Sequence, residues 1–293
     1  MIGALIIALR EGLEIALVVV IMLAYLRKSN QSAMNVYVFS GLVLAGITSL
    51  LIGGGIVAIW GSVEEVVLEI FEGVLVVIAS LLLTTMIVWM KRKGKEISSD
   101  IEASIEGKLQ TEGRWGLALL SFALVLREGV EIVLFTAALV IREGYQTYIG
   151  LTLGLVLAAG IGIGIYRGSL EIRFRTFFKW TSAFLILFAA GMLAYGIHEL
   201  QEAGFLLIGP LEIWNINPPA LPGGAVHPLH EDGFIGGLAK SLFGYNGNPS
   251  ALEVASYLSY ILVMGIYFFK KREKDSVPSV SKDLKDETPS KRL

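Results

Sequence analysis

The sequence contains no cysteine. Disulfide bonds are therefore excluded, and so are metal sites built on thiolates. Histidine is scarce, with three residues in 293, and only 17% of the residues are charged, against about a quarter in an ordinary soluble domain. Apolar residues take their place: they make up 54% of the chain and gather in long blocks. Seven methionines leave thioether sulfur available as a soft metal ligand.

The apolar blocks are long enough to cross a lipid bilayer. A hydrocarbon core about 30 Å thick requires about 20 apolar residues in a helix. Because the first block begins at Met1 without a basic leader or a small-residue cleavage site, we expect a retained span and not a signal peptide. The sequence predicts an all-α, polytopic membrane protein with seven transmembrane helices, at 2–26, 36–60, 66–90, 115–141, 146–166, 177–199 and 253–270.

The basic residues predict an orientation for these spans. If seven spans alternate in direction, twenty of the 24 Lys and Arg residues fall on one side of the membrane and two on the other. The remaining two, Arg10 and Arg127, lie inside spans. Basic residues are enriched on the cytoplasmic side of membrane proteins. We therefore expect the N-terminus outside and the C-terminus in the cytoplasm, an N-out/C-in topology.

One charged motif occurs twice inside the apolar blocks. It reads LREGLEIAL at 9–17 and LREGVEIVL at 126–134, in the first and fourth predicted spans. An offset of three spans reverses the direction of the second copy, which predicts a 3+3 inverted repeat plus one extra helix; such repeats commonly bind substrate where the two halves meet. The expected units are 1–90 (repeat 1), 91–114 (cytoplasmic connection), 115–199 (repeat 2), 200–252 (external loop), 253–270 (seventh helix) and 271–293 (cytoplasmic tail).

Segments outside the spans have patterns of their own. In the cytoplasmic connection, apolar residues recur every four positions from Ile97 to Leu109, which predicts a short surface helix. The external loop holds six prolines, and its apolar stretch at 204–214 is expected to rest on the membrane surface or dip into it. The tail, 271–293, is charged, lacks an apolar period and is expected to be disordered.

The motif charges stand in the central part of their spans, where each costs roughly 2.5–3.5 kcal/mol if unpaired. Glu11 and Glu14 share one helix face, and Arg10 neighbours Glu14 one turn away. The second copy repeats this spacing, so antiparallel packing of the two helices brings four carboxylates and two guanidinium groups together. Without a cation, some of these glutamates should carry protons. With one, the oxygens suit hard ions such as Mg²⁺, Ca²⁺, Mn²⁺ and iron. Salt bridges within each helix explain only one carboxylate of each pair.

The duplicated Arg-Glu-Gly-x-Glu motif resembles that of the high-affinity iron permease family, which comprises oxidase-dependent fungal iron transporters and bacterial EfeU-type transporters. The resemblance covers residues 1 to about 270 and includes the N-out/C-in topology. In that family the R-E-x-x-E motifs are taken to bind iron during translocation. By this resemblance, Glu11, Glu14, Glu128 and Glu131 are metal ligands, and Arg10 and Arg127 serve as counter-ions or in gating.

Acidic residues at the start of the third span are further candidate ligands. Glu69 and Glu72 share one helix face with Glu65. Glu72 is expected to face the same interior as the motif carboxylates. A cation arriving from outside would meet a negative funnel that raises its local concentration.

The three histidines all fall on the predicted outer side. His198, Glu199 and Glu202 end the sixth span and are expected either to form an outer metal site or to cap the helix and pair with the loop. The other two histidines lie in the loop sequence HPLHED, from His227 to Asp232. These residues are expected either to form a capture site for iron or to be an ordinary solvated loop.

These patterns and the resemblance predict an iron importer of the cytoplasmic membrane, carrying ferrous or ferric ion through the paired carboxylate motifs. Iron is the cargo, and neither a cofactor nor an enzymatic activity is expected. The expected partners are the lipid bilayer and a separate extracytoplasmic iron-oxidising or iron-delivering protein, with no nucleic acid. One alternative is a carrier of another divalent cation, such as Mn, Pb or Ca. The other is a membrane di-iron carboxylate oxidase, although such sites usually add Glu-x-x-His where this chain has Glu-x-x-Glu.

Overall fold

The computed structural model describes residues 1–60, 65–93, 97–168, 174–219, 221, 226–231 and 233–269. Within these residues the fold is all-helical, without β-strands, as predicted. Each predicted span matches a long helix whose ends lie within a few residues of the expected ones. The described helices are α1 (Ile2–Lys28), the short 3₁₀ helix η1 (Ser32–Met34), α2 (Asn35–Trp60), α3 (Glu65–Lys93), α4 (Ile97–Thr111), α5 (Gly113–Glu143), α6 (Gln146–Tyr166), α7 (Phe174–Glu202), α8 (Phe234–Phe243) and α9 (Ala251–Phe269).

Five segments of these helices are long and apolar enough to cross a membrane: Ser32–Ala58, Val67–Lys91, Gln146–Tyr166, Trp180–Glu202 and Ala251–Phe268. Helices α1 and α5 are as long, at 27 and 31 residues, but each carries the three charged residues of its motif in the middle. The sequence predicted seven spans, and composition alone identifies five of them. The two that composition leaves out are the two that bear the motif.

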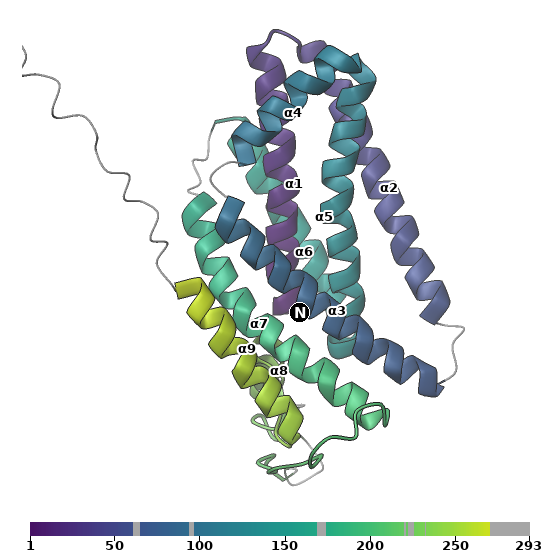
Figure 1. The fold of residues 1–293 in the computed structure, drawn as a ribbon, viewed down its shortest axis with the longest axis vertical. Helices are drawn as coiled ribbons and strands as arrows, with labels where there is room; N and C mark the ends of the chain where they lie inside the picture. Colours follow the sequence, from purple (N-terminus) through teal and green to yellow (C-terminus); the bar gives the residue numbers. More distant parts are fainter. Residues whose placement is uncertain are drawn as a thin grey trace, which may run out of the picture.

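The long helices pack in three pairs, of which two run parallel and the third, between α3 and α7, runs antiparallel. Helix α1 lies along α6, α2 along α5, and α3 along α7, while α9 covers α7 (Figure 1). Exchanging α1, α2 and α3 with α5, α6 and α7 leaves this set of pairs unchanged. Helices α1 and α5, which carry the two motif copies, also contact each other near the middle of the molecule.

Small residues allow the paired helices to approach closely. A Cβ atom added to Gly12 of α1 would lie 2.6 Å from the Cβ of Ala158 on α6, and one added to Gly162 would lie 2.7 Å from the Cβ of Ala16. On the other pair, a Cβ on Gly41 of α2 would lie 2.8 Å from the backbone nitrogen of Phe122. Helix association in membranes depends on such close contact, because lipid provides no hydrophobic drive.

Helix α4 is the predicted helix of the cytoplasmic connection, and its apolar side is buried. Ile101 and Ile105 pack with Leu26 of α1, Val38 of α2 and Leu117 of α5. The repeat of four residues therefore marks a contact face. Figure 1 shows α4 lying across one end of the bundle, beside the ends of α1 and α5.

The segment between α7 and α9 was predicted as one external loop, and it contains the helix α8. Helix α8 was not predicted, although Gly244 supplies a left-handed C-terminal cap with φ 71°. The apolar stretch at 204–214 is not helical and exposes Phe205 and Leu207. Its backbone is tied to the start of α9 by a bond from Ala251 N to Pro210 O. The predicted disordered tail at 271–293 lies outside the described residues.

Candidate metal centre

The motif charges lie at the contact between α1 and α5. Arg10 and Glu11 are fully buried, and Glu14 and Glu128 are 7% and 6% exposed. Glu131 is partly buried. Ionised groups stay buried only when partners surround them, so the neighbours of these five side chains decide what the site can do.

Three carboxylates converge from the two helices. One ligand oxygen from each of Glu11, Glu128 and Glu131 lies within 4.8 Å of the other two. Two metal–oxygen bonds of about 2.0–2.6 Å span about 4–5 Å when they point in opposite directions. A single cation can therefore contact all three oxygens without a large rearrangement. Glu14 lies one turn beyond Glu11 on α1 and faces a cavity that Glu128 also lines.

The arginine of the first motif is enclosed. Arg10 Nη1 lies 3.4 Å from Glu11 Oε1, and Arg10 Nη2 lies 3.3 Å from Glu14 Oε1. The guanidinium also donates to the thioether sulfur of Met86 on α3. Arg10 therefore supplies positive charge to both glutamates of its own helix.

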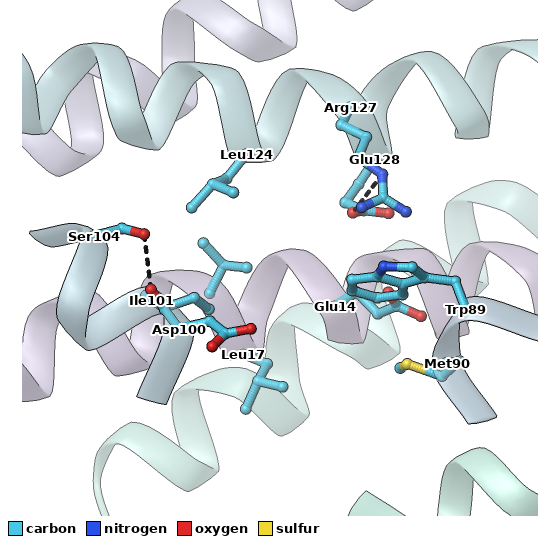
Figure 2. Close-up of a pocket in the computed structure, with 11 residues that line it drawn as sticks. Glu14, Leu17, Trp89, Met90, Asp100, Ile101, Ser104, Leu124, Arg127 and Glu128 are labelled. Carbon is cyan, nitrogen blue, oxygen red and sulfur yellow. Dashed lines mark hydrogen bonds and ion pairs between the residues drawn. The ribbon is translucent and has the colours of Figure 1, made fainter. Parts of the chain in front are cut away.

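The arginine of the second motif is half-exposed. The side chain of Arg127 is 45% accessible, and its Nε lies 3.2 Å from Glu131 Oε1 and 3.8 Å from Glu128 Oε1. Its guanidinium carbon stands 4.8 Å from the ring centroid of Trp89 on α3, in cation–π geometry. Figure 2 shows this stack beside Glu128. The two copies of the motif thus have the same letters and different surroundings.

Four buried carboxylate oxygens accept no hydrogen bond from any described residue: Glu11 Oε2, Glu14 Oε1, Glu128 Oε2 and Glu131 Oε2. A buried acceptor without a partner costs about 1–3 kcal/mol, and more when it is charged. One such oxygen occurs on each of the four motif glutamates. Glu14 Oε1 is ion-paired with Arg10 Nη2, so a hard cation would give a new partner to the other three oxygens and would compete with Arg10 for the fourth.

A cavity of about 170 Å³ adjoins the carboxylates on the side of α4. Glu14, Glu128 and Arg127 line one end, and Asp100 of α4 lines the other (Figure 2). Much of the remaining wall is apolar and comes from α1, α3, α4 and α5: Leu17, Val18, Trp89, Met90, Ile101 and Leu124. Glu14 and Glu128 of the motif are therefore connected to the α4 end of the bundle by a partly open cavity.

The acidic residues predicted on α3 do not join the converging carboxylates. Glu69 is exposed and Glu72 is partly buried. Among the described residues, the three converging carboxylates come from α1 and α5 alone. The predicted shared interior for Glu72 therefore stays a prediction.

The residues at the end of α7 form a small cluster with a residue that sequence reasoning missed. His198 Nε2 lies 3.4 Å from Glu202 Oε1, and His198 Nδ1 lies 3.3 Å from Glu253 Oε2 of α9. Glu253 is 5% exposed and also accepts hydrogen bonds from the Asn246 side chain. Glu199 is partly buried on the same helix end. His198 thus ties α7 to α9, and no sequence spacing links it to Glu253, 55 positions later.

The HPLHED loop forms hydrogen bonds within itself and with neighbouring segments. His227 Nδ1 accepts a hydrogen bond from Leu229 N, and a carboxylate oxygen of Glu231 accepts one from Gly247 N. His230 is partly buried, and Asp232 lies outside the described residues. These contacts correspond to the ordinary-loop alternative for His227 and Glu231.

Comparison with known proteins identifies relatives of this chain among iron permeases. The iron permease FTR1 family matches residues 1–275. Ferrous iron permease EfeU of Yersinia pestis is 34% identical over 264 residues, which cover 89% of this chain and 90% of that protein. Ferrous iron permease EfeU of Escherichia coli O6:K15:H31 (strain 536 / UPEC) is 33% identical over 260 residues, covering 87% and 91%. An uncharacterized protein of Archaeoglobus fulgidus is 33% identical over 270 residues, covering 90% and 93%. No solved structure matches the chain.

The family match extends across the described helices from α1 to α9 and includes both copies of the motif. The resemblance indicated by the duplicated motif is thereby confirmed over nearly the whole chain. With its five apolar helices, the molecule is a multi-pass membrane protein. The chain belongs to the iron permease FTR1 family.

Proposed function

We propose that this protein imports ferrous iron across the cytoplasmic membrane and binds the ion between α1 and α5. The observation that carries the proposal is the convergence of Glu11, Glu128 and Glu131, with oxygens within 4.8 Å of one another. Ferrous iron is the cargo named for the relatives in Yersinia pestis and Escherichia coli. The carboxylates suit such a hard-to-borderline divalent ion.

The arginines act as counter-ions when the site holds no metal. Arg10 lies between Glu11 and Glu14, and Arg127 lies beside Glu131. As iron binds, the carboxylates turn from guanidinium to metal, and the arginines keep the net charge of the site low. This competition weakens iron binding enough to permit release. A cation held by four carboxylates without arginines would leave slowly.

For transport we propose that α1–α3 and α5–α7 form the two halves of an inverted repeat. The helix pairs support this arrangement. If α1, α2 and α3 are replaced by α5, α6 and α7 and the reverse, the pair of α1 with α6 becomes the pair of α5 with α2, and the pair of α3 with α7 is unchanged. In such repeats one half rocks against the other around a central site. The enclosed Arg10 and the half-exposed Arg127 suit a state in which the site communicates with the α4 side and is closed on the other.

The outer surface has a supporting role in this proposal. With the N-terminus outside, Glu69 and Glu72 of α3 and Glu199 and Glu202 of α7 would lie on the side where iron arrives. Their charge raises the local concentration of cations, and does so less at high ionic strength. A separate extracytoplasmic protein that oxidises or delivers iron would dock on this side.

Ferrous iron uptake into proteoliposomes, with ascorbate present to keep the iron reduced, tests the proposal. We expect Glu11→Gln and Glu128→Gln each to reduce the initial rate at low iron by at least about tenfold, which corresponds to roughly 1.4 kcal/mol of lost binding free energy. Glu102→Gln, on the exposed surface of α4, is the matched control and should transport as the parent does. Full uptake by both motif variants would refute the proposed site, and no uptake by the parent protein would refute the function.

A further inference from the structure

The cavity between the motif and α4 carries one acidic residue that the permease motif does not include. Asp100 stands in the first turn of α4 and lines the cavity at the end away from Glu128. Figure 2 shows its carboxyl group directed into the space between α4 and Glu14. Asp100 is exposed, so three carboxylates from three different helices, Glu14, Glu128 and Asp100, border one partly open cavity of about 170 Å³.

Two of these carboxylates are placed to pass a cation into the cavity. Glu14 and Glu128 are 7% and 6% exposed, and both border the cavity. Glu128 Oε2 accepts no hydrogen bond from any described residue, and Glu14 Oε1 lies 3.3 Å from Arg10 Nη2. A divalent ion moving out of the motif toward α4 would meet these oxygens first.

The rest of the cavity is unfavourable to a cation. Leu17, Ile101 and Leu124 offer no ligands, and the guanidinium of Arg127 repels positive charge. An ion that loses water among apolar side chains pays a desolvation penalty. A negative group on the far wall lowers that penalty and shortens the step between one set of oxygens and the next.

We propose that Asp100 is the cation ligand of a second, transient site, which receives the divalent ion from Glu14 and Glu128 on its way to the α4 side. The proposal rests on the proposed iron transport through the motif. Asp100 gives a binding oxygen at the mouth of the cavity, where water can complete the coordination shell. The ion therefore moves from a buried carboxylate set to a partly hydrated one before it leaves.

Because Asp100 lies at the α4 end of the cavity, its loss should affect iron binding from the α4 side of the membrane only. Iron supplied from the α4 side binds first at Asp100, and its loss raises the KM measured from that side. Iron supplied from the opposite side binds first at the outer residues and the motif, so its KM is unaffected while the maximal rate falls. A residue that merely stabilises α4 would change transport without this difference between sides.

Initial rates of ferrous iron uptake in inverted and right-side-out membrane vesicles test the inference. For Asp100→Asn we expect the KM for iron offered on the α4 side to rise about tenfold, with an unchanged KM from the other side. Asp100→Glu, which keeps a carboxylate, should retain most of the parent's affinity. Glu102→Gln, on the exposed surface of the same helix, is the matched control.

A further variant separates the cavity ligand from a helix-stabilising charge. An acidic residue in the first turn also favours α4 through the helix dipole. Combining Ser99→Asp with Asp100→Asn restores that charge without restoring the carboxylate at position 100, and we expect the raised KM to persist. Rescue by this double variant, or an unchanged KM for Asp100→Asn from the α4 side, would overturn the inference alone. A parent protein that moves no iron in either vesicle type would overturn the proposed transport with it.

Discussion

Arg10 and Arg127 occupy equivalent positions in the two copies of the motif, yet they have different neighbours. Arg10 is fully buried between Glu11 and Glu14. Arg127 keeps 45% of its side chain accessible and lies over Trp89. Removal of one partner from a buried ion pair leaves uncompensated charge, whereas exposed pairs contribute little.

The two arginines should therefore differ in their effect on stability. We expect Arg10→Met to lower the free energy of unfolding by about 3–5 kcal/mol, because Glu11 and Glu14 lose their guanidinium partner. Arg127→Met should lower it less, because 45% of that side chain is accessible and Trp89 shares its contact with Glu131. Thermal unfolding of the purified proteins in the same detergent, without added metal, measures both. Equal losses for the two variants would contradict the asymmetry.

The sequence predicted which residues meet at the centre, but not how the two copies differ. Spacing of three and four residues placed Glu11, Glu14 and Arg10 on one helix face, and in the structure Arg10 pairs with each of the two glutamates. The stack of Arg127 on Trp89 depends on the path of α3, which identical motif letters do not encode. The pairing of His198 with Glu253 likewise depends on how α9 covers α7.

At the scale of elements, small residues decide how closely the helices approach. Gly162 of α6 faces Ala16 of α1, where an added Cβ would lie 2.7 Å from the Cβ of Ala16. Gly160, two positions earlier on the same helix, has no neighbouring atom within 4 Å of such a Cβ. Gly162 thus faces α1 and Gly160 faces away from other helices, so the two positions can be compared directly.

Alanine at these two glycines should have opposite effects. Gly162→Ala forces α1 and α6 apart, and we expect a loss of about 1–3 kcal/mol of stability together with reduced iron uptake, because α1 carries the first motif. Gly160→Ala should be neutral or gain up to about 1 kcal/mol from its better helix propensity. Unfolding midpoints and uptake rates of the two variants provide the comparison. A stable, active Gly162→Ala protein would mean that the close contact has no role.

Elements with strong local signals were predictable, and those with tertiary causes were not. The repeat from Ile97 to Leu109 predicted a helix, and the burial of Ile101 and Ile105 explains that repeat. Helix α8 has only ten residues, and its third and fourth residues are glycine, so helix propensity argued against it. Its cap at Gly244 packs against Gly191 of α7, where a Cβ on Gly191 would lie 2.7 Å from the Gly244 Cα.

For the whole molecule, orientation in the membrane determines what the geometry means for transport. The enclosed side holds Arg10, and the cavity opens from the motif toward Asp100 on α4. If α4 faces the cytoplasm, as the basic residues predict, the cavity belongs to the exit path of an importer. If α4 faces outward, the same cavity becomes the path by which the ion enters.

The absence of cysteine from the chain makes this orientation directly measurable, because each introduced thiol is unique. Tyr145, between α5 and α6, is 74% exposed and should face outside, whereas Gln110 on α4 is exposed and should face the cytoplasm. We expect a membrane-impermeant maleimide to label Tyr145→Cys in intact cells and Gln110→Cys only after permeabilisation. The unmodified chain, which cannot react, is the control. The reverse labelling pattern would reverse the N-out/C-in topology, and Asp100 would then lie where iron first binds.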